Sequence, residues 1–319
     1  MRTKKTNVSG AVLAAVAFAC HACASHALAP PTVKNAEIAS AGALPPTVEE
    51  LKNATYAGID DRLGTVTLAN GRWTGVPPVL DAASRPIVEL ADDFRIAGDL
   101  DGDGDDEAVV VLTYSSGGTG VLSFLAVVKH ENGALRNVAT TGLGDRVQIR
   151  SARIDGGRLF VSAVRAGDND AACCPGELVD LQWTLGEGRL NPLGTVITGR
   201  LSLATLAGTV WVLRAWDLID PAESEPVVTL AYESGRFTGT SGCNRYSGGV
   251  EAGDLPGVVK VGLLAGTRMA CPEPQSSVEG RFLGQLGGAR TIGFRLGRLA
   301  IGYARADGSQ GTMVFEARP

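Results

Sequence analysis

The sequence predicts a mainly β fold made of two antiparallel, β-rich domains. Three observations carry this prediction: many turn-forming residues, few aromatic ones, and apolar residues that alternate with polar ones. The chain of 319 residues holds 42 glycines and 15 prolines, and only 5% of its residues are aromatic. This composition favours short strands joined by tight turns, and alternation with a period of two indicates strands with one buried face. The length supplies about two domains, each large enough to bury a core.

The N-terminus has the features of a signal peptide. Arg2, Lys4 and Lys5 precede an apolar stretch, residues 8–19, that is too short to cross a bilayer as a helix but suits a signal-peptide core. We therefore predict a signal peptide over residues 1–27 and no transmembrane helix in the mature chain. The mature protein is expected in the periplasm or associated with the outer membrane.

A lipid anchor is the alternative to plain cleavage of the leader. Either Cys20 or Cys23 would carry the lipid, but a lipobox usually has Leu three residues before its Cys, and Ala17 and Cys20 stand there. Plain cleavage is therefore favoured. The Ala- and Pro-rich segment 28–46 is predicted to be a linker.

The charge balance excludes one class of partner. The chain carries a net charge of −5, and no run of Lys and Arg follows its first residues. Binding to nucleic acid needs a concentrated basic face that displaces counterions. We therefore expect no nucleic-acid partner.

Four cysteines remain after the leader: Cys173, Cys174, Cys243 and Cys271. An envelope compartment is oxidising and favours disulfides, and three full pairings of four cysteines exist. The favoured one joins Cys243 to Cys271 within one domain. It leaves Cys173 and Cys174 as either a vicinal bridge or free thiols, and spacing alone does not decide between these.

The first predicted domain spans residues 47–199. Thr47 and Glu50 match a capping box, so a short helix should follow to about Ala54. Beyond it, hairpin signals such as Asn70-Gly71 and Asn132-Gly133 separate strand-like runs and predict a β-meander. These runs are 64–68, 108–114, 121–128, 135–140, 147–154, 159–164 and 178–185. Residues 186–199 show no sustained periodicity.

The second predicted domain spans residues 205–319. Six runs predict strands: 209–216, 227–232, 236–239, 292–296, 299–304 and 312–317. One segment has helical spacing instead, with Val278, Phe282, Leu283 and Leu286 on one face. Ser276 and Ser277 are predicted to cap this helix and Gly287-Gly288 to end it, so that one helix packs across the sheet.

The sharpest chemical signal is an acidic loop at residues 98–107. It offers carboxylates at loop positions one, three, five and nine, a backbone carbonyl at position seven, and Gly104 for the bend, an oxygen set that suits Ca²⁺. The predicted ligands are Asp99, Asp101, Asp103, Asp105 through its carbonyl, and Glu107. Val110 stands where an EF-hand has its bidentate Glu. The segment instead resembles the Ca²⁺ loops of FG-GAP and integrin-type repeats, although it occurs once. The alternative is a solvated acidic turn. A structural Ca²⁺ of weak affinity is favoured, because clustered acids repel without a cation.

Three motifs near the C-terminus resemble the META (HslJ-type) domain. They are Trp211-Val212-Leu213, the run 237–248 that contains Gly242-Cys243-Asn244-Arg245-Tyr246, and Thr267-Arg268-Met269-Ala270-Cys271-Pro272-Glu273. The resemblance covers about residue 205 to the end. It implies a small β-rich domain, a sheet or partial barrel with one helix, related to heat shock and other envelope stress, and it implies no reaction.

The polar residues of these motifs have two interpretations. Asn244, Arg245, Tyr246 and Arg268 would form a binding surface, or the motif residues would serve only to fix the fold. The second is favoured, because motifs rich in Gly, Cys, Asn and apolar residues usually determine structure. In that interpretation Gly242 and Asn244 suit a turn with positive φ.

Few residues support catalysis. His130 is the one histidine left after the leader, and it lies in the predicted hairpin tip 129–133, where we expect it to be solvated. Multi-histidine zinc sites are therefore excluded, and a Ser-His-Asp or Cys-His arrangement is disfavoured. The sequence also lacks a G-x-S-x-G elbow, a P-loop and a strand-linked G-x-G-x-x-G. Carboxylate-pair glycosidase chemistry stays open, because the separation of acids is not visible in a sequence.

The leading hypothesis is an exported, non-catalytic envelope protein that acts as a stress-related or binding module and carries a structural Ca²⁺. Its partner would be an envelope protein or a small ligand. Two alternatives are an inhibitor or accessory subunit of an envelope enzyme, and a carboxylate-dependent hydrolase of cell-wall glycans.

Overall fold

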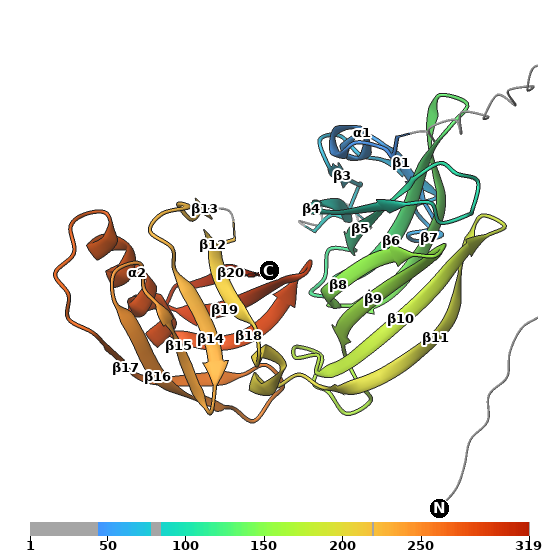
Figure 1. The fold of residues 1–319 in the computed structure, drawn as a ribbon. Helices are drawn as coiled ribbons and strands as arrows, with labels where there is room; N and C mark the ends of the chain where they lie inside the picture. The colour runs from blue at the N-terminus through green and yellow to red at the C-terminus, as the bar shows by residue number, and fades with distance from the viewer. Residues whose placement is uncertain (1–43, 78–83, 219, 319) are drawn as a thin grey trace, which may run out of the picture. The chain divides into compact units, whose positions relative to one another are not determined.

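The computed structural model describes residues 44–77, 84–218 and 220–318. The predicted signal peptide, the two candidate lipidation cysteines and most of the predicted linker lie outside the described residues. The described chain consists mainly of strands in several antiparallel sheets, which confirms the predicted fold class (Figure 1). None of the described helices is both long and apolar enough to span a membrane.

The predicted capping box begins helix α1 (Val48–Lys52). The Thr47 hydroxyl accepts a hydrogen bond from the Glu50 amide at 3.3 Å, and the Glu50 carboxylate accepts one from the Thr47 amide at 2.8 Å. This reciprocal pair satisfies amides that the first helical turn leaves without partners. Helix α1 is followed by the short hairpin of β1 (Thr55–Ala57) and β2 (Thr65–Thr67).

The cap gives a simple test. We expect Thr47→Ala to lower the free energy of unfolding by about 1 kcal/mol, because the Glu50 amide then loses its acceptor. Urea denaturation followed by circular dichroism measures this loss. Thr47→Ser keeps the hydroxyl and should unfold like the natural protein; an equal loss in both variants would contradict the role of the cap.

Two antiparallel sheets follow the first hairpin. The first has the order β3-β4-β5-β6-β7 and the second β11-β10-β9-β8. Their strands are β3 (Arg72–Thr74), β4 (Ile87–Gly98), β5 (Glu107–Ser115), β6 (Leu122–Glu131), β7 (Ala134–Asp145), β8 (Gln148–Asp155), β9 (Arg158–Arg165), β10 (Glu177–Gly186) and β11 (Arg189–Arg200). The predicted meander is thus divided between two sheets. Asn132-Gly133 has the two positive φ angles, 53° and 77°, that a tight hairpin turn requires.

Strand β5 is buried on both faces. Val110 and Leu112 pack against the side that contains α1, whereas Val109 and Val111 pack against residues of the second sheet such as Val161. The continuous apolar run at 108–112 therefore marks a central strand between two packed layers. This places the acidic loop, which precedes β5, at the end of the most buried strand of the first sheet.

Residues 186–199, which show no sustained periodicity in the sequence, nevertheless have regular structure. They contain most of β11, which pairs with β10 and is the edge of its sheet. Of its residues only Leu190 is buried, and the register with β10 shifts twice. A strand with both faces exposed needs no alternation of apolar and polar residues, so the sequence carries no period-two signal.

The C-terminal sheet has the order β17-β16-β15-β14-β12-β20-β19-β18, with β13 beside β12. Its elements are the 3₁₀ helix η1 (Leu203–Leu206), β12 (Val210–Trp216), β13 (Asp220–Pro221), β14 (Thr229–Glu233), β15 (Arg236–Thr240), β16 (Arg245–Ala252), β17 (Val259–Gly266), helix α2 (Gln275–Gly287), β18 (Ala289–Arg295), β19 (Arg298–Ala304) and β20 (Gln310–Ala317). An isolated bridge between Val258 and Thr291 brings the two ends of the sheet together. The sheet is therefore a partial barrel with one packed helix, as predicted (Figure 1).

Helix α2 buries Phe282 and Leu286 on the face that the sequence predicted. Its predicted cap is wrong, because the helix begins at Gln275 and Ser276 and Ser277 lie in its first turn. The Glu273 carboxylate accepts hydrogen bonds from the Ser276 hydroxyl and, at 3.3 Å, from the Ser277 amide. Glu273, an acid before the helix, thus caps the N-terminal turn that a serine was expected to cap. The helix ends at Gly287 and Gly288, as predicted. The limits of the two predicted domains, 47–199 and 205–319, stay predictions.

Candidate functional site

The acidic loop connects β4 to β5, where Gly98 pairs with Glu107. Gly102 and Gly104 have φ angles of +82° and +91°, which L side chains rarely adopt. Gly104 thus provides the bend that the sequence predicted at this position. The loop turns its backbone amides toward its own carboxylates.

These internal hydrogen bonds fix the loop. The Asp99 carboxylate accepts from the amides of Gly102 at 2.7 Å and Gly104 at 3.2 Å. Asp101 accepts from the Asp103 amide at 3.2 Å, and Asp103 from the Asp105 amide at 2.9 Å. Such bonds are typical of tight acidic turns with or without a cation.

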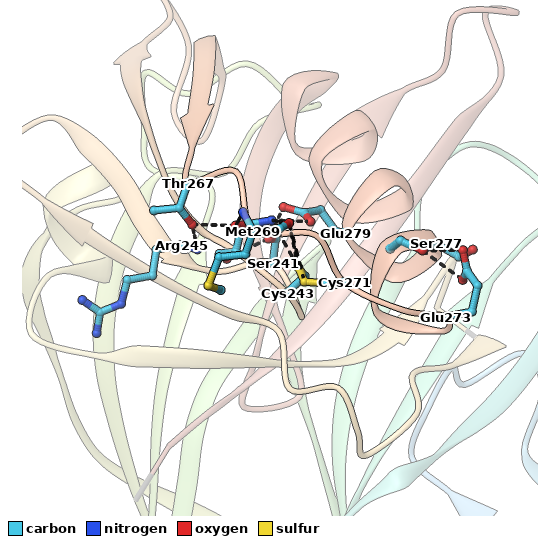
Figure 2. Close-up of a disulfide and its surroundings, with 11 residues drawn as sticks. Ser241, Cys243, Arg245, Thr267, Met269, Cys271, Glu273, Ser277 and Glu279 are labelled. Atoms are coloured by element: carbon cyan, nitrogen blue, oxygen red, sulfur yellow. Dashed lines mark hydrogen bonds between the residues drawn. A yellow bond between two sulfur atoms is a disulfide. The ribbon is translucent and has the colours of Figure 1, made fainter.

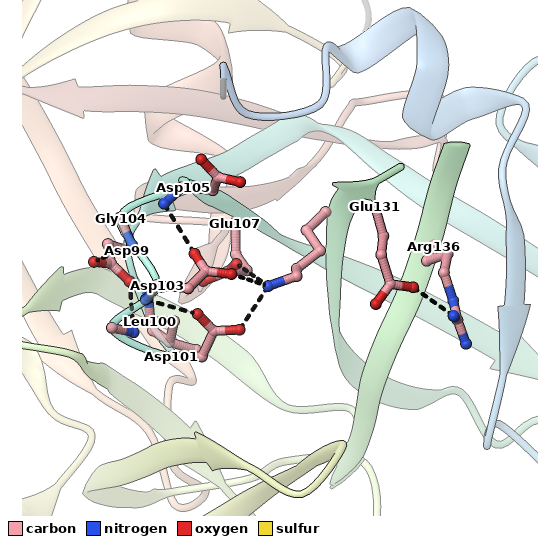
Figure 3. Close-up of polar contacts among 11 residues, drawn as sticks. Asp99, Leu100, Asp101, Asp103, Gly104, Asp105, Glu107, Glu131 and Arg136 are labelled. Carbon is pink, nitrogen blue, oxygen red and sulfur yellow. Dashed lines mark hydrogen bonds and ion pairs between the residues drawn. The ribbon is translucent and has the colours of Figure 1, made fainter. Parts of the chain in front are cut away.

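Lys129, on β6, brings an ammonium group into the loop, and the sequence analysis missed it. Its Nζ atom lies 2.7 Å from Asp101 Oδ2, 2.6 Å from Asp103 Oδ2 and 3.4 Å from Glu107 Oε1. Figure 3 shows the carboxylates of Asp101, Asp103 and Glu107 converging. The side chain of Lys129 is only 12% exposed. Burial opposes its charge, but the bonds to Asp101 and Asp103 outweigh burial and raise its pKa.

A signal for Lys129 was present in the strand pattern. Ala108 of β5 pairs with Val128 of β6, so Glu107 and Lys129 occupy the next opposed positions of the same ladder. Opposite charges at such positions attract one another across a pair of strands. The register of two predicted strands would therefore have been needed to find it.

Glu107 is the buried member of the cluster. Its side chain is 0% exposed, and its Oε2 accepts a hydrogen bond from the Leu100 amide at 2.8 Å. Its Oε1 has no hydrogen-bond partner and only the longer ion pair with Lys129. Burial is the main cause that raises the pKa of this carboxyl.

The donor set fits a hard cation in part. Asp99, Asp101 and Glu107 each offer a carboxylate oxygen, and these oxygens lie within 4.8 Å of one another. Oxygen ligands from carboxylates are those that Ca²⁺ prefers. Asp103 and Asp105 are not members of this group of three. The structure thus brings together three of the four predicted carboxylate ligands and adds an ammonium beside them; the fifth predicted ligand, the Asp105 carbonyl, stays a prediction.

The second predicted cluster lies beside α2. Cys243 and Cys271 are paired as a disulfide, with Cα atoms 6.1 Å apart (Figure 2). Gly242 has the predicted positive φ of +98°, whereas Asn244 is not among the positive-φ residues. Asn244 contributes through the hydrogen bonds of its side chain instead of through its backbone conformation.

Asn244 is the buried centre of a hydrogen-bond network. Its Oδ1 accepts from the Thr267 hydroxyl at 2.7 Å and the Met269 amide at 2.8 Å. Its Nδ2 donates to Glu279 Oε2 at 3.0 Å and to the Met269 carbonyl at 3.3 Å. Ser241, also buried, donates to Glu279 Oε1 at 2.8 Å. The network ties the turn before β16 and the segment after β17 to helix α2.

Comparison with known protein families gives a match to the C-terminal region of the chain. Residues 204–317 match the family model of the META domain. The META domain predicted from the motifs is therefore present. The matched residues do not include the acidic loop. No curated protein matches the chain. A solved structure, described as the NMR structure of the protein from Burkholderia xenovorans, is 28% identical over 36% of this chain and 86% of that chain. Its TM-score is 0.28, which supports no argument about fold.

The four residues predicted as a binding surface of the META domain do not share one environment. Arg245 and Arg268 are exposed, whereas Asn244 and Tyr246 are buried. The Tyr246 hydroxyl donates to the Thr229 carbonyl at 3.0 Å, and its ring meets the edge of Phe282 at a centroid distance of 5.3 Å. The hydrogen bonds and ring contact of Asn244 and Tyr246 are therefore internal to the domain, and only the two arginines of the four are exposed.

His130 is not the solvated hairpin side chain that the sequence predicted. Its ring nitrogens lie 3.2 Å from the Leu44 carbonyl and 3.1 Å from a Glu50 carboxylate oxygen. The side chain packs beside α1, which the hairpin motif could not indicate. The Thr47 cap and the bond to His130 lower the pKa of Glu50 to about 2.

Proposed function

We propose that this protein is an exported, non-catalytic protein of the bacterial cell envelope. In this proposal the META domain is a stress-related or binding module, and the acidic loop holds a Ca²⁺ ion that stiffens the sheet of β3 to β7. The basic and apolar N-terminus and the paired cysteines support export. The observation that carries the calcium proposal is the convergence of Asp99, Asp101 and the buried Glu107.

The balance of charge at the loop favours a divalent cation. One ammonium faces the carboxylates of Asp101, Asp103 and Glu107, and Asp99 adds a further acid beside them. A buried carboxylate without full compensation is unfavourable, and Glu107 Oε1 lacks a hydrogen bond. A divalent ion bound by Asp99, Asp101 and Glu107 would neutralise more of this negative charge than the single Lys129 ammonium does.

Lys129 and Ca²⁺ then compete for the same oxygens. Two of the three converging ligands, Asp101 and Glu107, are also partners of the Lys129 ammonium. Calcium would displace that ammonium, which stands on a flexible four-carbon stem and can withdraw. Lys129 is therefore the counter-ion without calcium and the residue that weakens calcium binding.

Calorimetric titration with CaCl₂ tests this proposal. For the natural chain we expect weak binding, with Kd on the order of 10⁻⁴ to 10⁻³ M. Lys129→Met removes the competing charge and should lower Kd by roughly 10-fold, which corresponds to about 1.4 kcal/mol. Asp101→Asn should reduce the heat of binding below detection at the same concentrations, because it removes a negative charge from a shared ligand. Bound calcium should also raise the melting temperature.

Asp168→Asn, which alters an acid outside the loop, is a matched control and should leave the titration unchanged. If neither the natural chain nor Lys129→Met releases heat or gains thermal stability with CaCl₂, the calcium site is refuted. Lys129 would then be the permanent counter-ion of the loop.

The remaining parts of the proposal have separate tests. N-terminal sequencing of the protein recovered from periplasm should find a start near residue 28, and an intact leader would contradict export. Purified protein should not degrade peptidoglycan. Turnover that is lost on substitution of one buried acid would instead support the hydrolase alternative, and a stoichiometric envelope enzyme recovered with the protein would support an accessory subunit.

A further inference from the structure

The loop between β9 and β10, residues 166–176, carries two adjacent cysteines. Cys173 and Cys174 are paired with each other in the structure, and their Cα atoms are 3.8 Å apart, closer than the roughly 4.4–6.8 Å of ordinary disulfides. Cys173 is exposed and Cys174 is half-buried. A small thiol in solution therefore reaches the pair without unfolding of the sheet.

Asp170 holds the loop in shape. Its side chain is 1% exposed, and its Oδ2 accepts hydrogen bonds of 2.8 Å from the amides of both Gly167 and Gly176. Its Oδ1 is paired with Arg200 at the end of β11. Burial raises the pKa of Asp170, but these bonds outweigh burial and lower it. One buried carboxylate thus joins the two ends of the loop.

The Cys173–Cys174 bond adds almost nothing to the stability of this loop. A disulfide stabilises a fold chiefly by shortening the loops available to the unfolded chain, and a bond between neighbours closes no such loop. The Cys243–Cys271 pair is different, because its sequence separation is 28. A bond that does not stabilise the native state is not protected by folding against reduction, whereas the Cys243–Cys271 bond is.

Cys173 is exposed, the two cysteines are adjacent, and Asp170 holds the loop without help from their bond. We propose that Cys173 and Cys174 form a thiol–disulfide exchange site whose co-reactant is a dithiol. This activity goes beyond the proposed function, does not rest on it, and would replace its non-catalytic part with a redox role. A thiolate of the dithiol attacks Sγ of Cys173, and Cys174 leaves as a thiolate that takes a proton from water. The second thiolate of the dithiol then attacks its own mixed-disulfide sulfur and releases Cys173. Two electrons pass to the protein, and the dithiol becomes a disulfide. The oxidised form is restored by the reverse reaction with a disulfide of the same class.

The test uses the full mature chain and dithiothreitol. The protein is equilibrated with increasing reductant, trapped with iodoacetamide and mapped by peptide mass spectrometry. Cys173 and Cys174 should be alkylated at a dithiothreitol concentration at least roughly 10-fold lower than Cys243 and Cys271. The melting temperature should stay unchanged while only the first pair is reduced, because Asp170 still holds the loop. Reduction of both pairs together, or a fall in melting temperature with the first pair, would overturn the proposal.

Single variants test which sulfur is attacked. Cys174→Ser leaves one thiol at position 173, and Cys173→Ser leaves one at 174. The first variant should react faster with an aromatic disulfide reagent, because Cys173 is the more exposed residue. A faster reaction at Cys174 would contradict the assigned order of attack. Isolation of the natural protein with Cys173 or Cys174 bonded to Cys243 or Cys271 would refute the site altogether.

Discussion

Phe282→Ala is expected to lower the free energy of unfolding by about 3–5 kcal/mol. Phe282 is 0% exposed on the inner face of α2, and its ring packs against the buried Tyr246 of β16. Truncation removes most of the side chain that seals the helix to the partial barrel, and it leaves a cavity that neighbouring strands cannot fill by a small shift. Urea denaturation followed by tryptophan fluorescence measures the loss.

Gly284→Ala on the same helix provides the matched control. Gly284 is exposed, and an added Cβ would meet no other atom within 4 Å. Alanine restricts the unfolded chain and favours the helix, so this variant should be more stable by about 0.5–1 kcal/mol. If Phe282→Ala were as mild as an average surface change, within about 0.5 kcal/mol, α2 would not be closing the core.

The same helix shows how far sequence reasoning reaches. The spacing of Val278, Phe282 and Leu286 predicted the buried face, because a helix repeats every 3.6 residues whatever it packs against. Glu279 lies three residues before Phe282 and seven before Leu286, so it belongs to the inward stripe too. An acid on that stripe was the available signal for the network with Asn244, and its partners could not be named without the strands that carry them.

Two of the missed strands, β4 and β11, lack a regular alternation of buried and exposed residues. Strand β4 contains a register shift between Leu90 and Arg95, which moves successive side chains to the other face and breaks the alternation. Strand β11 is exposed on both faces and therefore has no alternation to detect. Two-residue turns such as Asn132-Gly133 were predictable because their backbone angles are a local property of the residues themselves.

The acidic loop shows the limit for the candidate site. Spacing of the acids predicted that Asp99, Asp101 and Glu107 lie together, since residues of one loop are local in sequence. Lys129 comes from another strand, 22 residues after Glu107, and its approach depends on the register of β5 with β6. Whether the Lys129 ammonium or a calcium ion neutralises these carboxylates therefore depends on a tertiary contact. No local sequence pattern predicts that contact.

Asn244→Ala should cost about 2–3 kcal/mol, because it leaves part-buried polar groups without their partners, and such a loss costs about 1–3 kcal/mol for a fully buried group. The groups affected are the Met269 amide, the Thr267 hydroxyl and one oxygen of Glu279. Asn244 itself is only 5% exposed, whereas Thr267 and Met269 are exposed, so water replaces part of the lost hydrogen bonding. Urea denaturation at pH 7 measures the loss, and Arg268→Ala, at an exposed position beside the network, should change stability by less than about 0.5 kcal/mol.

Asn244→Asp separates hydrogen bonding from shape, since it keeps the volume of the side chain and the acceptor for Thr267 and Met269. Its second oxygen replaces the Nδ2 donor and faces Glu279 Oε2, which accepts from Nδ2 at 3.0 Å in the natural protein. Two carboxylates at this distance repel, so the pKa of one of them must rise in the folded variant. The folded state then binds a proton more tightly than the unfolded chain, and the stability of Asn244→Asp relative to the natural protein increases as pH falls from 7 toward 5. Asn244→Ala should show no such recovery. A loss in Asn244→Asp that does not change with pH would mean that Glu279 and Asn244 are not in contact in solution.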